Sequence, residues 1–252
     1  MLRTELLTKS YGPAVAANEI SFEVPAGSLT GVVGPNGAGK TTTLSMISGL
    51  LRPSSGRVTV GDVDVWADGP AAKRLIGTLP DRLRLFDRLT GAQLLYYSGV
   101  LHGVPEAELA TRSAELAEAF ELGSALDRLV SDYSAGMQKK VALACSMIHA
   151  PELLVLDEPF EAIDPVSAAT VTELLEKYAA SGGAVVMSSH SLELIQRVCD
   201  HVVIIVDGSI IAQGTVDEVR DGASLEERFR ELTGDGESRR GLQWLHGSSD
   251  SD

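Results

Sequence analysis

The chain is poor in cysteine and has no long hydrophobic run, and each shortage excludes a class of protein. Its two cysteines, Cys145 and Cys199, are too few and too isolated for a disulfide scaffold or a metal site. Both lie in segments with the apolar pattern of helices, so we expect reduced, buried thiols. No apolar run approaches the roughly 20 residues that a membrane-spanning helix requires, so the chain itself is not expected to form a channel.

Basic residues are also scarce in this sequence. Lys and Arg number 21 against 35 Asp and Glu, which gives a formal net charge of −14. Nucleic-acid binding depends on clustered cations that release counterions from the phosphate backbone, so we expect no nucleic-acid partner. The first residues lack the apolar stretch of a secretory signal, which predicts that the chain stays in the cytoplasm.

Apolar residues are plentiful enough for a large folded core. The 252 residues are 44% hydrophobic and 22% charged, as expected for one large domain or a domain with an added lobe. Short β-type runs at residues 2–8, 20–24 and 57–60 predict a small antiparallel layer. From residue 90 to 149, apolar side chains recur at helical spacing, which predicts a helical insert.

The second half of the chain alternates between strand and helix patterns. The expected strands are residues 152–156, 184–187 and 202–206, and the expected helices are residues 166–180 and 192–198. This rhythm is typical of parallel β-α units, so the predicted fold is an α/β core that carries a helical insertion. A short amphipathic piece follows at residues 224–232, and the polar end of the chain is expected to be mobile.

Residues 34–41, G-P-N-G-A-G-K-T, match the phosphate-binding pattern G-x-x-x-x-G-K-[ST] in full. Glycines let such a loop turn its backbone N–H groups toward a phosphate, while Lys40 supplies a charge and Thr41 offers a hydroxyl to Mg²⁺. A predicted strand at 29–33 and a predicted helix at 41–50 flank the loop, as the motif requires. The candidate nucleotide-binding residues are Gly34, Pro35, Asn36, Gly37, Ala38, Gly39, Lys40, Thr41 and Thr42.

Two acidic residues follow the buried run Leu-Leu-Val-Leu at residues 153–156. Ligands bind at the carboxyl edge of open α/β sheets, where these acids are expected to lie. Asp157 is placed to hold hydrated Mg²⁺, and Glu158 to orient or deprotonate the water that attacks the γ-phosphate. The alternative is that both acids only cap the turn at Pro159.

A second motif, Y-S-A-G-M-Q at residues 133–138, resembles the signature segment of the nucleotide-binding subunit of ATP-binding-cassette (ABC) transporters. The resemblance extends from residue 2 to about residue 221. It implies that Ser134 and Gly136 contact the γ-phosphate of ATP bound by an opposite copy, together with the amino end of their helix. Ala135 stands where the family usually has glycine. Taken alone, Ser-Ala-Gly before a helix would be an ordinary helix cap.

Further residues match the family in the expected order. Tyr11 resembles the aromatic residue that stacks on adenine, and His190 the histidine that hydrogen-bonds the γ-phosphate. A lone histidine would otherwise be structural. Asp164 matches the segment that crosses the dimer interface, although the residues before it differ from the commonest form. The other histidines show no metal-ligand spacing.

The sequence departs from the family at Asp81, where a glutamine generally stands. Ionised aspartate is one methylene shorter and cannot donate a hydrogen bond, so we expect it to contact Mg²⁺ through water, beside Thr41 and Asp157. The following loop, residues 82–89, interleaves basic and apolar residues. It is either a solvated loop or, as the resemblance implies, the receiver of a short cytoplasmic helix of a membrane partner.

Together, these features predict a P-loop NTPase core of the ABC ATPase type, with an antiparallel β layer and an inserted helical subdomain at about 82–148. Residues 1–222 would form this ATPase domain, and residues 223–252 a C-terminal helix and mobile tail. The resemblance implies an ATP-hydrolysing, Mg²⁺-dependent subunit that pairs with a second copy and drives export through an integral membrane subunit, on the cytoplasmic face of the membrane. A soluble ATPase of an assembly complex, such as iron–sulfur cluster biogenesis, is the alternative, and an inactive regulatory cassette is a third.

Overall fold

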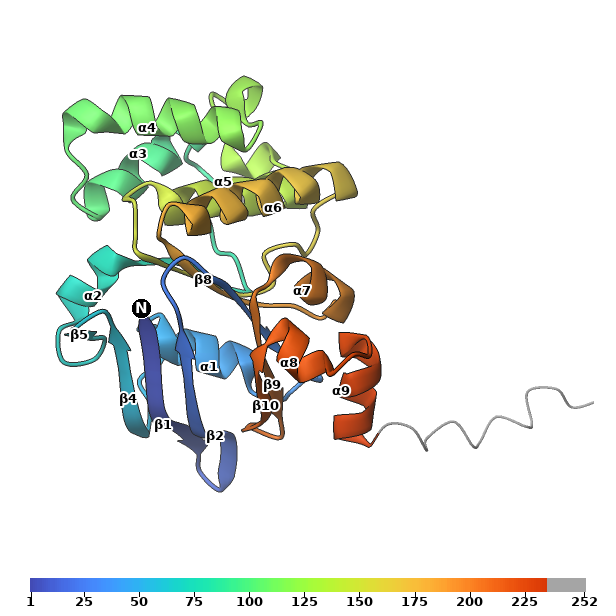
Figure 1. The fold of residues 1–252 in the computed structure, drawn as a ribbon. Coiled ribbons are helices and arrows are strands. Elements are labelled where there is room, and N and C mark those ends of the chain that lie inside the picture. Colours follow the sequence, from blue (N-terminus) through green and yellow to red (C-terminus); the bar gives the residue numbers. More distant parts are fainter. Residues whose placement is uncertain (235–252) are drawn as a thin grey trace, which may run out of the picture.

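The computed structural model describes residues 1–234, and the tail expected to be mobile lies largely outside this range. Two sheets and the helices around them make up the fold (Figure 1). The smaller sheet is antiparallel, with strand order β2-β1-β4-β5. Its strands are β1 (Leu2–Tyr11), β2 (Ala14–Val24), β4 (Ser55–Val60) and β5 (Val63–Asp64). The predicted antiparallel layer is therefore present, with β1 and β2 longer than the sequence pattern indicated.

The larger sheet has six strands in the order β10-β9-β3-β8-β7-β6. They are β3 (Leu29–Val33), β6 (Ile76–Leu79), β7 (Leu153–Leu156), β8 (Ala184–Ser188), β9 (His201–Val206) and β10 (Ser209–Thr215). All are parallel except β10, which pairs antiparallel with β9. The two edge strands, β6 and β10, were not predicted, because one is only four residues long and the other is only partly buried.

Three helices form the insert: α3 (Gly91–Leu101), α4 (Glu106–Ala119) and α5 (Ala135–Met147). They gather at one end of the molecule, on the far side of the larger sheet from the antiparallel layer (Figure 1). The remaining helices are α1 (Lys40–Ile47), α2 (Gly69–Leu75), α6 (Pro165–Ala180), α7 (Leu192–Val198), α8 (Val216–Arg220) and α9 (Leu225–Thr233). Helix α1 ends three residues before the predicted limit, because Gly49 takes a left-handed conformation with φ 75°.

Two apolar clusters hold these layers together. One packs the larger sheet against α5, α6 and α7. The other fills the space between the two sheets, where α1 contributes Leu44, Met46 and Ile47. Burial of α1 between the sheets fixes its amino end at the carboxyl edge of the larger sheet, since α1 follows β3 after a short loop.

Both cysteines are free, as expected, but their surroundings differ from the prediction. Cys199 is buried just beyond the end of α7 rather than inside a helix, and Cys145 in α5 is only half-buried. Burial raises the pKa of the Cys145 thiol to about 11 and that of Cys199 further. Both thiols are therefore protonated at neutral pH and are poor nucleophiles.

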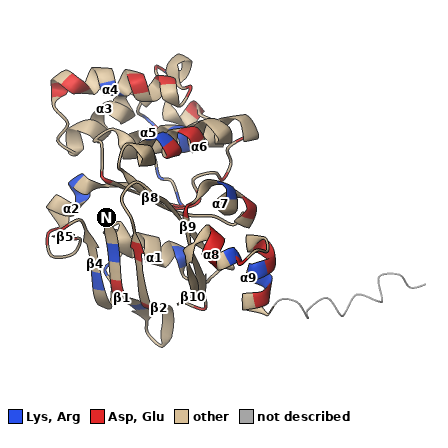
Figure 2. Cartoon of the chain, in the orientation of Figure 1, with Lys and Arg blue, Asp and Glu red and all other residues tan. Residues whose placement is uncertain are grey.

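Charged residues are spread over helices, loops and the strands of the smaller sheet, with acidic side chains conspicuous along α4 and α9 (Figure 2). The interior strands β7 and β8 of the larger sheet are apolar over their length until Ser188, the last residue of β8. Within residues 1–234, no helix combines the length and the apolar character that crossing a membrane would take.

Candidate functional site

The phosphate-binding loop joins the end of β3 to the start of α1. Gly39 is the residue before α1 and has φ 102°, and a Cβ there would lie 2.2 Å from the backbone oxygen of Ala16. Only glycine fits this position, because both the left-handed backbone and the close approach of β2 exclude a side chain. Among residues 1–234 no side chain caps α1, so its first N–H groups stay open to an anion.

Lys40 folds back over this loop. Its Nζ donates to the backbone oxygens of Gly34 at 2.7 Å and Pro35 at 3.2 Å, and the residue is 7% exposed. Burial lowers the pKa of Lys40, while the carboxylates of Glu158 and Asp157 raise it. The ammonium group therefore lies close to both the loop and the acidic edge of the sheet.

Asp157 and Ser188 meet where β7 and β8 end. The Ser188 hydroxyl donates to Asp157 Oδ1 at 2.5 Å, and its oxygen accepts from the backbone N–H of Glu158 at 2.9 Å. Asp157 is 4% exposed and Ser188 is fully buried. The sequence analysis missed Ser188, and its position at the end of a buried strand beside two acids was the signal that could have found it.

Glu158 lies between the loop and His190. Its Oε2 accepts from the backbone N–H of His190 at 3.3 Å. Its Oε1 lies 3.2 Å from His190 Nε2, yet among the described residues this buried oxygen has no partner in hydrogen-bond geometry. Burial raises the pKa of Glu158, against the lowering effect of the neighbouring His190. A carboxylate with a raised pKa and a free oxygen suits a base that accepts a proton from water.

One pocket of about 500 Å³ collects most of the predicted residues. Its lining is Ala16, Asn36, Gly37, Ala38, Gly39, Lys40, Thr41, Thr42, Asp81, Arg82, Glu158 and His190. A concave site of this size, with glycine-rich backbone and one buried lysine, can take a nucleotide phosphate chain. Arg82 was not predicted as a site residue.

A smaller neighbouring pocket of about 220 Å³ brings Thr41, Asp81 and Asp157 together. Hydroxyl and carboxylate oxygens are the donors that Mg²⁺ prefers, so these residues fit the ion. Within residues 1–234, no cluster of three or more His, Cys, Asp or Glu is arranged to hold a metal unaided. Phosphate oxygens and water would therefore complete the shell, as is usual for Mg²⁺.

Five predicted residues line neither pocket of their own chain. Gly34 and Pro35 are the first residues of the loop, and their backbone oxygens accept from Lys40. The other three lie further away. Tyr11 is 53% exposed at the end of β1, with Lys9 Nζ 5.3 Å from its ring centroid. The Ser134 hydroxyl accepts from Met137 N at 3.2 Å and so caps α5. Gly136 lies beside a neighbouring loop, where a Cβ would be 3.0 Å from the backbone oxygen of Ala162. The cap interpretation of Ser134 is correct for the single chain.

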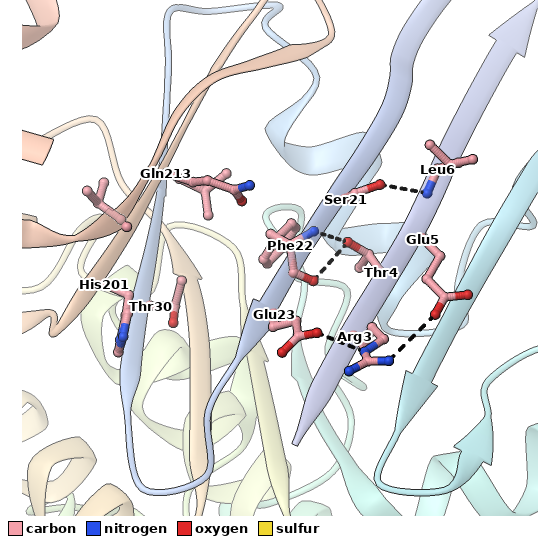
Figure 3. Close-up of a pocket in the computed structure, with 13 residues that line it drawn as sticks. Arg3, Thr4, Glu5, Leu6, Ser21, Phe22, Glu23, Thr30, His201 and Gln213 are labelled. Atoms are coloured by element: carbon pink, nitrogen blue, oxygen red, sulfur yellow. Dashed lines mark hydrogen bonds and ion pairs between the residues drawn. The ribbon is translucent and has the colours of Figure 1, made fainter. Parts of the chain in front are cut away.

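A larger pocket of about 640 Å³ lies between β1, β2 and the β9–β10 pair (Figure 3). None of the residues that line it belongs to the predicted site. Arg3 pairs with Glu23 at 2.9 Å, and Thr4 exchanges hydrogen bonds with the backbone of Phe22. These polar groups hold β1 against β2, so the 500 Å³ pocket is the better candidate for a nucleotide.

The family profile described as ABC transporter matches residues 17–161, which include the phosphate-binding loop, the signature segment and the acidic strand end. The chain belongs to the ABC transporter family. A solved structure described as the ATP-binding subunit of an ABC transporter has a TM-score of 0.88, with 31% identity over 92% of this chain and 99% of that one. The family resemblance and the α/β fold class are thereby confirmed, and the chain is an ATP-binding, ATP-hydrolysing subunit of this family.

This chain covers only part of the length of its curated ABC relatives. The Bacillus subtilis linearmycin resistance ATP-binding protein is 36% identical over 85% of this chain and 69% of its own length. The Streptomyces peucetius daunorubicin/doxorubicin resistance protein is 35% identical over 87% of this chain, and 66% of its length is covered. NatA of Bacillus subtilis, an ABC transporter ATP-binding protein, is 33% identical, and 87% of its own length is covered. The chain therefore spans about two thirds of the resistance proteins.

Proposed function

We propose that this ABC subunit hydrolyses Mg²⁺-ATP in a pocket completed by a second copy, and that closing of the pair drives export through a separate membrane subunit. The observation that carries the proposal is the division of the predicted residues. Lys40, Glu158 and His190 share one pocket, whereas Ser134 and Gly136 lie outside it in the same chain. A second copy can bring its own signature segment to the open side.

The residues of the 500 Å³ pocket have distinct tasks in this proposal. Lys40 and the open N–H groups of α1 hold the terminal phosphates, and Glu158 Oε1 takes the proton of the attacking water. His190 hydrogen-bonds the γ-phosphate and keeps the Glu158 carboxylate in place. Thr41, Asp157 and, through water, Asp81 would hold Mg²⁺, which supplies positive charge against the phosphates.

The energetics of closing require only a few contacts. Moving an equilibrium from 1:99 to 99:1 takes about 5.5 kcal/mol of differential binding. Hydrogen bonds to charged groups contribute about 1.5–3 kcal/mol each. Contacts of Ser134, Gly136 and the amino end of α5 with the γ-phosphate, made in two sites, are therefore sufficient. Loss of the γ-phosphate on hydrolysis removes them and lets the pair open.

The surface beside residues 82–89 supports a membrane partner. Leu83, Leu85 and Leu89 pack against the core, whereas Phe86 is 68% exposed. A groove of about 370 Å³ continues from this loop to α3 and α5. An exposed aromatic side chain at the mouth of a groove suits a short helix of another protein. The resistance relatives favour export as the direction.

We expect the native chain to be retained on membranes that contain its polytopic partner. Phe86→Ser should weaken this retention at least several-fold, because it removes an exposed apolar contact. Sedimentation of membranes, followed by quantification of the bound chain, measures the effect. Leu6→Ser is the matched control, since Leu6 is 59% exposed on β1, away from the groove. Recovery of the native chain only in a soluble assembly complex would favour the alternative function.

Asp81→Gln is expected to raise the Mg²⁺ concentration for half-maximal ATP hydrolysis about 10-fold. The substitution removes a charge that orients metal-bound water, and it lies in the pocket shared with Thr41 and Asp157. Titration of ATPase activity with Mg²⁺ measures this shift. Asp81→Asn, which keeps the side-chain length, separates the effect of charge from that of reach. An unchanged turnover and an unchanged Mg²⁺ requirement in Asp81→Gln would show that Asp81 has no metal role.

A further inference from the structure

Lys139 is a buried lysine in α5, the helix that begins at the signature segment. It is 4% exposed, and burial lowers its pKa. Its Nζ donates to the backbone oxygen of Glu158 at 2.9 Å. A buried ammonium group is costly unless it has partners, so a lysine that reaches this point has a specific contact to make.

The contact meets the backbone at an unusual conformation. Glu158 has φ 49°, in the left-handed region that residues other than glycine rarely adopt. Such a conformation persists only where its surroundings fix it. Three hydrogen bonds to its main chain do so here. The Glu158 N–H donates to Ser188, and the Glu158 carbonyl accepts from Lys139 at 2.9 Å and from the backbone N–H of Glu161 at 3.2 Å. The direction of the Glu158 side chain follows from this backbone.

The charges around Lys139 are a second reason for its buried position. The carboxylates of Glu161, Asp81, Glu158 and Asp157 all act on its ammonium group and favour its charged form. Lys139 is therefore a positive charge behind the acidic edge of the nucleotide pocket, on the side of the helical insert. Asp81, which stands where the family generally has glutamine, is one of the acids it offsets.

We propose that Lys139 is a positioning residue for ATP hydrolysis, which holds the main chain of Glu158 so that its carboxylate faces the nucleotide pocket. It acts through Glu158 and does not touch the nucleotide. The inference rests on the proposed role of Glu158 as the base. Helix α5 begins within the signature segment and carries Lys139 about one turn further on. The helix therefore links the signature segment to the base of the same chain.

The test compares Lys139→Met with Lys140→Met. Lys140 is the next residue of α5 and is also buried, but its Nζ pairs with Glu121 at 3.1 Å, away from the nucleotide. We expect Lys139→Met to lower kcat about 10²-fold, because small misplacements of catalytic groups cost this much. The KM for ATP should change less than about threefold, since phosphate contacts are intact. Lys140→Met should keep a kcat close to that of the native chain.

Two further measurements separate positioning from general stability. Lys139→Arg keeps a cationic donor and should recover most of the lost kcat, whatever Lys139→Met does to folding. In single-turnover hydrolysis, adding Lys139→Met to Glu158→Gln should lower the residual rate by less than about twofold, because both act through one group.

A kcat of Lys139→Met equal to that of Lys140→Met would overturn the inference. The inference would also be overturned if Lys139→Met lowered the single-turnover rate of the Glu158→Gln variant by a full 10²-fold. A kcat of Lys139→Arg as low as that of Lys139→Met would overturn it as well. Absence of hydrolysis by the native chain would instead overturn the proposed function, and with it this inference. If the native chain hydrolyses ATP and Lys139→Met hydrolyses it equally fast, only the positioning role of Lys139 is overturned.

Discussion

Glu158→Gln is expected to lower kcat for ATP hydrolysis by about 10³-fold and to make an ATP-bound dimer accumulate. The first effect follows from loss of the base, since general base catalysis contributes about 10²–10⁴-fold. The second follows because the γ-phosphate contacts that close the pair are then not removed by hydrolysis. Steady-state phosphate release measures the rate, and size-exclusion chromatography at saturating Mg²⁺-ATP measures the dimer.

The fold of this variant is checked by its thermal stability. The pKa of Glu158 is raised by burial, so the folded carboxyl group holds its proton more tightly than the unfolded one. Stability therefore falls as pH rises through the raised pKa, and ionised Glu158 destabilises the fold at neutral pH. Glutamine lacks this charge, so the Tm at neutral pH should equal or exceed that of the native chain. A monomer at saturating ATP would contradict the proposed closing of the pair.

Mixing two inactive variants is expected to restore hydrolysis. Lys40→Met removes the phosphate-binding ammonium, and Ser134→Arg places a long cation where the opposite nucleotide would lie. Each alone should lose at least about 10²-fold in rate, because each lacks a group that stabilises the transition state. A mixed pair has one site built from the native loop of one copy and the native signature of the other. With random pairing, single-turnover hydrolysis should return to roughly a quarter of the native amplitude.

The controls for this experiment are set by the structure. Ser134 also caps α5, and loss of a cap costs about 1 kcal/mol, so the Tm of Ser134→Arg must be measured. A control chain carries both Lys40→Met and Ser134→Arg. Pairs of this chain with either single variant contain no intact site, so mixing them should not restore hydrolysis. Failure of the two single variants to complement, with both folded, would argue that each pocket is complete within one chain.

Sequence analysis predicted the centre of the fold well. The strand at residues 29–33 and the helix at residues 192–198 have the predicted limits in the structure. Buried parallel strands are short apolar runs bounded by turn residues, and the phosphate-binding motif fixes its own neighbours. The clustering of the candidate residues in one pocket was predictable for the same reason, because Lys40 and Glu158 follow strand ends that one sheet edge brings together.

Other parts depend on contacts that no local pattern records. The edge strand β10 forms by pairing with β9, and its apolar run, residues 210–212, is too short and too partly buried to predict a strand of seven residues. Ser188 and Lys139 take their roles from hydrogen bonds to residues on other elements. A lysine in a helical pattern is normally expected on a solvated face, so the burial of Lys139 required the packing of α5 against the sheet.

The two poorly reactive thiols have a practical consequence for experiments on this protein. Because the thiols of Cys145 and Cys199 stay protonated at neutral pH, maleimide and nitroxide reagents should modify them slowly. A cysteine introduced at an exposed position, such as Phe86→Cys, would then carry the label selectively without prior removal of the native ones. Spectroscopic distances between labelled copies become accessible in an otherwise unaltered chain.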